Sequence, residues 1–194
     1  MKRLVLSSTE ADHHHRSRLL EAMAEVVAAK GFADTTIADV VAHASVSRRT
    51  FYEHFATKAD CLVALYEAAS HNALKVLRGA IDPSHDWGVQ LERALGAYLA
   101  CMATNPVLMR TLFIEILGLG TQGLAARRRV NLEIAGFMLG VINARRAVPL
   151  SPELAMAVVG GIHELVLQAV EDGKVTELQA LTETASQLVK AVTR

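Results

Sequence analysis

The sequence predicts an all-α protein of about nine helices, in which a three-helix N-terminal module precedes a larger helical bundle. Three observations support this fold class. Alternation typical of strands is absent, apolar residues recur at spacings of three and four, and only 4 prolines and 12 glycines interrupt 194 residues. We place the domain boundary where short predicted helices give way to long ones, which divides the chain into residues 1–57 and 58–194.

The N-terminal module begins with a helix in which Leu19, Met23 and Val26 form one apolar stripe, and Gly31 follows as a left-handed stop. Three helix starts come next in quick succession, each marked by a hydroxyl residue suited to capping. They are Thr36 with Asp39, Ser47 before Arg48, and Thr57 with Asp60. The first and third have the spacing of a capping box. Short helices of this kind must share one core.

Longer helices are predicted after residue 57. Asn105-Pro106 and Ser151-Pro152 each supply an N-cap followed by proline at the first helical position. Three nearby glycines, at 118, 120 and 123, leave one helix start uncertain. The expected ranges are 58–79, 87–104, 106–118, 121–146, 152–172 and 176–192.

Composition narrows the class of protein. The 20 basic and 20 acidic side chains cancel, so any affinity for nucleic acid must come from local placement of charge. Cys61 and Cys101 lie far apart and fit two reduced thiols in a cytoplasmic protein. The N-terminus lacks the apolar run of a signal peptide, and residues 154–170 are interrupted by His163 and Glu164 and are judged too short to span a bilayer. We therefore expect a soluble protein without a targeting signal.

Residues 36–55 predict a helix-turn-helix. Apolar residues give a two-turn helix one buried face, Ser45-Val46 turns the chain, and Ser47 caps a second helix. Phe51 and Phe55, four positions apart, would face the core, while the opposite face carries arginines in its first turn. A helix fits the major groove of B-DNA, and arginine there commonly binds guanine.

The same segment resembles the TetR family of transcriptional regulators. The matching residues are Thr36, Asp39, Val40, Ala44, Val46, Ser47, Thr50, Phe51, Tyr52, Phe55, Lys58 and Leu62. Three positions depart from the family pattern. Val41 replaces a small residue, Arg49 stands where glycine or proline is common, and Ser45 replaces the glycine of the turn. Ser45 must therefore accept a left-handed or nearly left-handed backbone, at a cost of roughly 1 kcal/mol.

The resemblance implies roles for individual residues. Arg48, Arg49, Thr50 and Tyr52 would read bases in a double-stranded DNA operator. The expected phosphate contacts are Thr36, Ser47, His54 and Lys58. Lys58 also suits this role by position, because it adds a cation near helix-start amides. A basic N-terminal arm containing Lys2, Arg3, Arg16 and Arg18 is one interpretation, and a disordered tail is another.

One helix-turn-helix covers few base pairs, so we expect a homodimer on a palindromic operator. The apolar penultimate and last helices offer an interface, with Gly160 and Gly161 permitting close approach. The residues assigned to it are Val158, Ile162, Leu165, Val166, Leu181 and Leu188.

The resemblance also implies a small-molecule inducer, of unknown identity, that releases a repressor from DNA. The candidate pocket residues are Trp87, Tyr98, Met102, Met109, Phe113, Glu115, Phe137, Met138 and His163, although each could be ordinary core.

The main alternative is a helical ligand-binding or enzymatic bundle that does not bind DNA. His163-Glu164 opens like a zinc-protease motif, but Leu167 occupies the position of the second histidine. Three consecutive histidines, His13 to His15, point in different directions on a helix and are read as a polar arm. Arg127, Arg128 and Arg129 are read as a solvated helix face. We predict no catalytic residue, no metal, no cofactor and no membrane partner.

Overall fold

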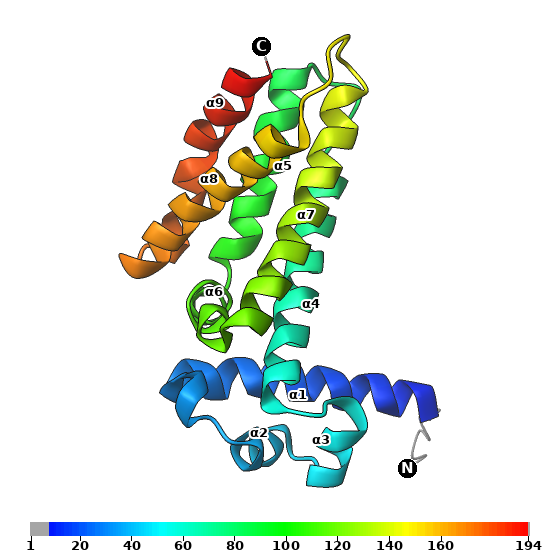
Figure 1. Cartoon of the computed structure of the whole chain (residues 1–194), viewed down its shortest axis with the longest axis vertical. Helices are drawn as coiled ribbons and strands as arrows, with labels where there is room; N and C mark the ends of the chain where they lie inside the picture. The colour runs from blue at the N-terminus through cyan, green and yellow to red at the C-terminus, as the bar shows by residue number, and fades with distance from the viewer. Residues whose placement is uncertain (1–7, 194) are drawn as a thin grey trace, which may run out of the picture.

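A computed structural model describes residues 8–193, and this part of the chain contains nine α-helices and two 3₁₀ segments (Figure 1). The prediction of an all-α chain with about nine helices is confirmed. The elements are α1 Ser8–Asp34, α2 Ile37–Ala44, α3 Arg48–His54, α4 Lys58–Gly79, α5 Trp87–Ala103, α6 Pro106–Phe113, η1 Glu115–Leu119, α7 Thr121–Asn143, α8 Pro152–Glu171, η2 Val175–Leu181 and α9 Thr182–Val192.

The first three helices form a unit at one end of the molecule. Helix α1 lies across this end, with α2 and α3 below it in Figure 1, and α4 rises from α3 into the rest of the chain. Leu19, Met23 and Phe51 are fully buried between these helices, which is the shared core that short helices require. Helix α4 packs against α1 as well as against α5 and α7. It therefore connects the N-terminal unit to the bundle.

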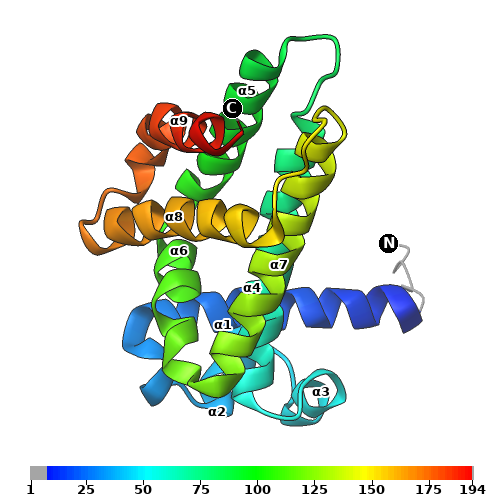
Figure 2. The same ribbon diagram turned by 45° about the horizontal axis from the view of Figure 1, so that its top comes forward.

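The larger unit is a bundle of the remaining helices. Helix α7 packs on both α4 and α8, and α5 packs on α4, η2 and α9. Helix α8 runs across the bundle in Figure 2, and α9 lies above it in that view. Proline at the first position starts α6 and α8, after Asn105 and Ser151 as N-caps, and both caps are as predicted.

The predicted helix over 106–118 ends early, and the chain continues as η1. Glycine is required at position 123 because η1 and α7 approach each other closely there. A Cβ atom on Gly123 would lie 1.8 Å from the carbonyl oxygen of Ile116, which no other residue could tolerate without backbone movement. Gly120, with φ 57°, supplies the left-handed turn between the two elements. The glycines that obscured this region in the sequence are the residues that allow the turn.

The expectation that residues 154–170 are too short to span a bilayer is wrong, because α8 extends beyond this range. With 20 residues, α8 is long and apolar enough to cross a membrane by length and composition alone. In this fold the helix instead packs on α7, α6 and η2, and buries Val158, Val159, Ile162 and Val166.

Cys61 and Cys101 are both free thiols. Burial raises the pKa of the Cys61 thiol to about 12.

Candidate nucleic-acid interface and ligand cavity

A capping box fixes the start of α2. The Thr36 hydroxyl accepts a hydrogen bond from the Asp39 amide at 3.2 Å, and the Asp39 carboxylate accepts one from the Thr36 amide at 2.8 Å. Lys30, from α1, donates a further hydrogen bond to the same carboxylate. The contacts with Lys30 and then Thr36 hold the pKa of Asp39 well below its usual range. This cluster ties α2 to α1 and sets its direction.

The turn between α2 and α3 has the conformation that the sequence required. Ser45 has φ 50° and ψ 48°, and among residues 8–193 it is the single non-glycine residue with positive φ. Its amide donates to the Ala42 carbonyl, and its own carbonyl accepts from the Arg18 guanidinium at 3.3 Å. Arg18 therefore braces the turn from α1.

Helix α3 presents one face to the core and the other to solvent. The Ser47 hydroxyl accepts from the Thr50 amide at 3.0 Å and caps the helix, while Phe51 and Phe55 are buried. The opposite face is open. Arg48 is exposed, the Tyr52 residue is 58% exposed, and the Arg49 side chain, paired with Glu53 at 3.1 Å, is 90% exposed. Thr50 is half-buried.

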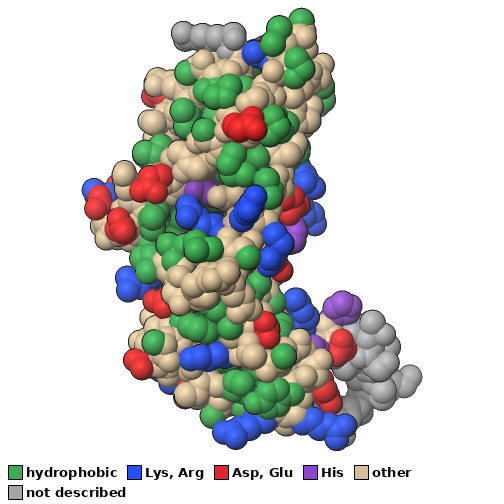
Figure 3. All heavy atoms as spheres, viewed as in Figure 1, with side chains coloured by type: hydrophobic (Ala, Val, Ile, Leu, Met, Phe, Trp, Pro, Cys, Tyr) green, Lys and Arg blue, Asp and Glu red, His purple; other side chains and the backbone are tan. Residues whose placement is uncertain are grey.

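The outer end of this unit carries Lys and Arg side chains, which Figure 3 shows at the lower edge of the molecule. Thr36 and Ser47 are exposed there as well. The arrangement brings the four predicted base-reading residues and two of the four predicted phosphate-binding residues to one solvent-facing end. Whether they bind DNA stays a prediction.

Lys58 has a different contact set from the one expected. Its ammonium donates to the carbonyls of Phe32 at 2.9 Å, Ala33 at 3.0 Å and Thr35 at 2.7 Å, at the C-terminal end of α1. It also lies 4.5 Å from the centroid of the Phe32 ring. All three N–H donors are thus used within the chain. Lys58 therefore caps the end of α1 in the chain alone, and its contact with a phosphate stays a prediction.

His54 is also turned away from solvent. Its side chain is only 6% exposed and lies 3.6 Å from the carboxylate of Asp12. This burial does not suit a phosphate contact.

The interpretation of the N-terminal residues as an arm also changes. His13 to His15, Arg16 and Arg18 belong to α1, and the Arg16 guanidinium lies 5.6 Å from the Phe55 ring centroid. Lys2 and Arg3 lie outside the described residues.

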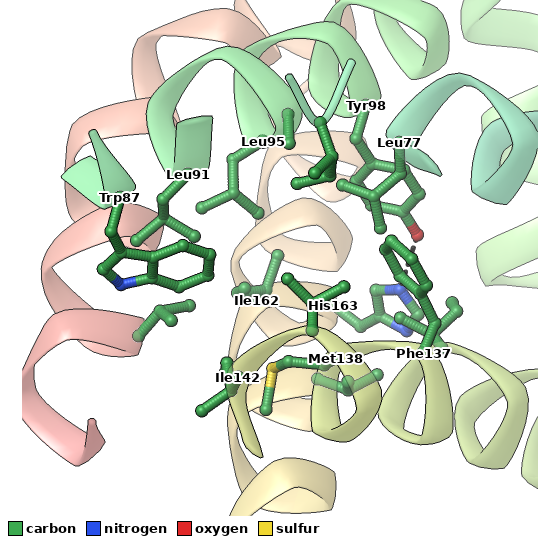
Figure 4. Close-up of a pocket in the computed structure, with 16 residues that line it drawn as sticks. Leu77, Trp87, Leu91, Leu95, Tyr98, Phe137, Met138, Ile142, Ile162 and His163 are labelled. Carbon is green, nitrogen blue, oxygen red and sulfur yellow. Dashed lines mark hydrogen bonds between the residues drawn. The ribbon is translucent and has the colours of Figure 1, made fainter. Parts of the chain in front are cut away.

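Two cavities lie inside the bundle. The first has about 620 Å³ of empty space, counted to its mouth, and is lined by α4, α5, α7, α8 and α9 (Figure 4). The second has about 580 Å³ and is lined by α4, α5, α6, η1, α7 and α8. Tyr98 and His163 line both, and the Tyr98 hydroxyl lies 2.9 Å from Nε2 of His163.

Eight of the nine predicted pocket residues line these cavities. Trp87, Phe137 and Met138 line the first, Met102, Met109 and Phe113 line the second, and Tyr98 and His163 line both. Burial lowers the pKa of His163 to about 4 and raises the pKa of the Tyr98 hydroxyl. The pair is therefore neutral at physiological pH.

Glu115 is the exception, because it lines neither cavity. Its carboxylate accepts a hydrogen bond from the Phe32 amide at 2.9 Å, just after the kink at Gly31. The unusual acid in an apolar run thus joins η1 to the end of α1. Its assignment to the ligand pocket is corrected on this ground.

The interface assignment is corrected in part. Val158, Ile162 and Val166 are 1%, 7% and 0% exposed within the single chain, so they belong to its own core. Leu165, Leu181 and Leu188 are half-buried. Gly161 serves an internal contact, since a Cβ there would lie 3.2 Å from Leu188. A Cβ on Gly160, in contrast, would have no atom within 4 Å apart from its chain neighbours and the backbone of its own helix.

Arg127 is the residue whose role the sequence analysis missed. It was read as part of a solvated face with Arg128 and Arg129, yet it is half-buried and lines the second cavity. The sequence did indicate that Arg127 faces inward, because it precedes the buried residues Val130 and Ile134 by three and seven positions.

No group of three or more His, Cys, Asp or Glu side chains suited to a metal occurs in the described part of the chain.

The fold and its exposed capped helix define a helix-turn-helix protein with a cavity-bearing helical domain. Residues 19–65 match the family model described as "Bacterial regulatory proteins, tetR family". This N-terminal segment is therefore similar to the TetR family. A curated relative, the uncharacterized HTH-type transcriptional regulator YxbF of Bacillus subtilis (strain 168), is 28% identical over 93 residues. That match covers 47% of this chain and 24% of the relative, so it spans about a quarter of that protein.

Solved structures share the fold over nearly the whole chain. The fatty acid degradation regulator FadR from Bacillus halodurans has a TM-score of 0.74 at 17% identity, over 89% of this chain and 93% of that one. FadR from Bacillus subtilis, in complex with stearoyl-CoA, has a TM-score of 0.71 at 19% identity, over 89% and 96%. The multidrug binding protein EbrR, complexed with imidazole, has a TM-score of 0.65 at 23% identity, over 90% and 94%.

Proposed function

We propose that the protein is a ligand-responsive transcriptional regulator, not an enzyme, that binds a palindromic DNA operator as a homodimer in the cytoplasm. Residues 1–57 would bind DNA, and residues 58–194 would bind a small molecule and form the dimer. The observation that carries the proposal is the outward face of α3. Arg48 and Arg49 project into solvent from a helix that is capped and anchored by two buried phenylalanines.

The chemistry of this face suits base recognition. Arg48, Arg49, Thr50 and Tyr52 would lie in the major groove, and the hydroxyls of Thr36 and Ser47 would contact the phosphates on either side. Arg49 is held by one exposed ion pair with Glu53, which is a weak interaction, so the guanidinium is free to exchange that partner for a base.

Repression with release by a small molecule is the proposed mode of regulation. The cavities supply the ligand site, and α4 links their walls to the DNA-binding unit. A ligand acts by favouring one spacing of the two DNA-binding units, with a coupling typically about 1 to 3 kcal/mol. Two of the similar structures are a regulator in complex with stearoyl-CoA and a multidrug binding protein, which supports a ligand role for the cavities of this chain.

In vitro selection of bound duplexes from random DNA tests the proposal directly. A two-fold symmetric consensus, with half-sites about one helical turn apart, is the expected result. Selection without any enriched sequence would contradict DNA recognition, and an asymmetric single half-site would contradict the dimer.

The dimer has its own test at Gly160, whose position is open within the chain. Gly160→Leu should dissociate the dimer, as measured by sedimentation, because the new side chain fills space that the partner would occupy. Gly140 on α7 also faces no atom within 4 Å, so Gly140→Leu is a matched control that should stay dimeric. A Gly160→Leu protein that stays dimeric would place the interface elsewhere.

A further inference from the structure

The two cavities differ in chemistry and share one wall. The first is lined almost entirely by apolar side chains from Leu77 to Val189, and its exposed lining is apolar throughout (Figure 4). The second adds the polar groups of Ser70, Tyr66 and Arg127 to an otherwise apolar lining. Since Tyr98 and His163 belong to both linings, the cavities adjoin at this hydrogen-bonded pair. The space on one side of this pair is apolar, and the space on the other side also contains polar groups.

Charge is distributed unevenly in this space. No aspartate or glutamate is among the residues that line either cavity. Arg127 is the charged side chain in the second cavity, and none of the ion pairs among the described side chains includes it. Its neighbour Arg129, by contrast, is paired with Glu67 at 2.6 Å. A half-buried arginine without a carboxylate partner favours an anion.

This inference rests on the proposed function, because it specifies the ligand of the same site. We propose that the two cavities together bind a linear amphiphile with a single anionic headgroup, such as a carboxylate with an unbranched alkyl chain. The headgroup pairs with Arg127, and the alkyl chain passes the Tyr98–His163 pair into the apolar cavity. A guanidinium forms two parallel hydrogen bonds with a carboxylate, which fixes the head at one end.

The same features exclude other ligand classes. A lipophilic cation would meet Arg127 without any lining carboxylate to balance its charge, and removal of both charges from water is unfavourable. A neutral alcohol retains the burial of its alkyl chain but loses the ion pair. Each added methylene should strengthen binding about fourfold until the apolar cavity is filled.

Trp87 provides a direct readout of chain insertion. It is the single tryptophan of the sequence, and its indole lines the apolar cavity beside Leu91 (Figure 4). Titration with decanoate, decanol and decylamine below their aggregation concentrations therefore reports binding as a change in tryptophan fluorescence. Decanoate should bind at least about tenfold more tightly than decylamine, with decanol in between.

Arg127→Gln isolates the contribution of the headgroup. It should weaken decanoate about tenfold and change decanol less than about twofold, because the alkyl chain is bound as before. Arg128→Gln is the matched control, since Arg128 is exposed and lines neither cavity, and it should bind all three compounds as the unmodified protein does. Thermal unfolding checks that both variants are folded.

Three results would overturn this inference. They are equal affinity for decanoate and decylamine, an Arg127→Gln protein with unchanged preference for decanoate, and no binding of decanoate at all. If such a result occurs while random-sequence selection still yields a symmetric operator, the ligand class is wrong and the proposed function stands. If decanoate binds as expected but no operator is selected, the proposed function fails and the ligand assignment remains.

Discussion

Replacement of Lys58 by methionine distinguishes between two roles for this side chain, a contact with DNA phosphate and a cap on the end of α1. The sequence pattern predicts a phosphate contact, whereas the structure gives its ammonium three carbonyl acceptors at the end of α1. Methionine keeps an unbranched apolar stem and removes the charge. Because α1 and α4 meet at this point, the variant should lower the free energy of unfolding.

The magnitude follows from the three hydrogen bonds. A hydrogen bond from a charged donor contributes about 1.5 to 3 kcal/mol, and the low end applies because the acceptor Ala33 is exposed. Three bonds would give roughly 4.5 kcal/mol, and water recovers part of this at the open carbonyls. We expect a loss of about 2 to 4 kcal/mol, which includes the contact of the ammonium with the Phe32 ring.

Urea unfolding monitored by circular dichroism measures this loss. Lys75→Met is the control, because Lys75 lies on the exposed side of the same helix and should change stability by less than about 0.5 kcal/mol. The capping role also predicts an unchanged salt dependence of operator binding. A Lys58→Met protein as stable as the control, with a salt slope lower by about one, would refute the capping role and restore the phosphate contact.

Three further predictions concern base reading, packing and protonation. Arg48→Ala should cost about 1 to 3 kcal/mol on the selected operator and relax one base position, and an unchanged consensus in repeat selection would contradict it. Gly123→Ala should lower the melting temperature strongly, since its Cβ would lie 1.8 Å from the Ile116 carbonyl oxygen; a wild-type melting curve would show that η1 does not approach α7 so closely. The pKa of His163 is lowered to about 4 by burial, so the unfolded chain binds a proton first as pH falls below about 6.5, and stability is lost between these values. His163→Gln should reduce that acid-induced loss by about 3 kcal/mol in unfolding measured from pH 7 to pH 4, and an unaltered pH profile would argue against a buried neutral imidazole.

The sequence predicted the fold well where local chemistry decides the structure. Thr36, Ser47 and Thr57 each start a helix because a hydroxyl side chain accepts from an amide three residues later, and this pattern is visible without tertiary information. The left-handed backbone of Ser45 was likewise required by the two helices around it. The outward face of α3 followed from the four-residue spacing of its phenylalanines.

Contacts between a side chain and a distant element were not predicted. Lys58 is bound by residues at and just after the end of α1, more than twenty positions away, and Glu115 by an amide 83 positions away. Val158 and Ile162 lie on an apolar helix face, and periodicity alone does not tell whether the chain itself or a partner covers that face. Arg127 was grouped with two neighbouring arginines, although each points in its own direction on a helix.

The corrected contacts of Glu115 and Lys58 meet at the same short segment. Glu115 binds the Phe32 amide from η1, and Lys58 binds the Phe32, Ala33 and Thr35 carbonyls from the first turn of α4. Leu117 of η1 also lines the second cavity, so a ligand there touches the element that carries Glu115. The end of α1 is therefore held between the cavity wall and the helix that follows α3. We expect a ligand that moves η1 relative to α4 to shift this segment, and to shift α2 with it, because α2 begins directly after the segment.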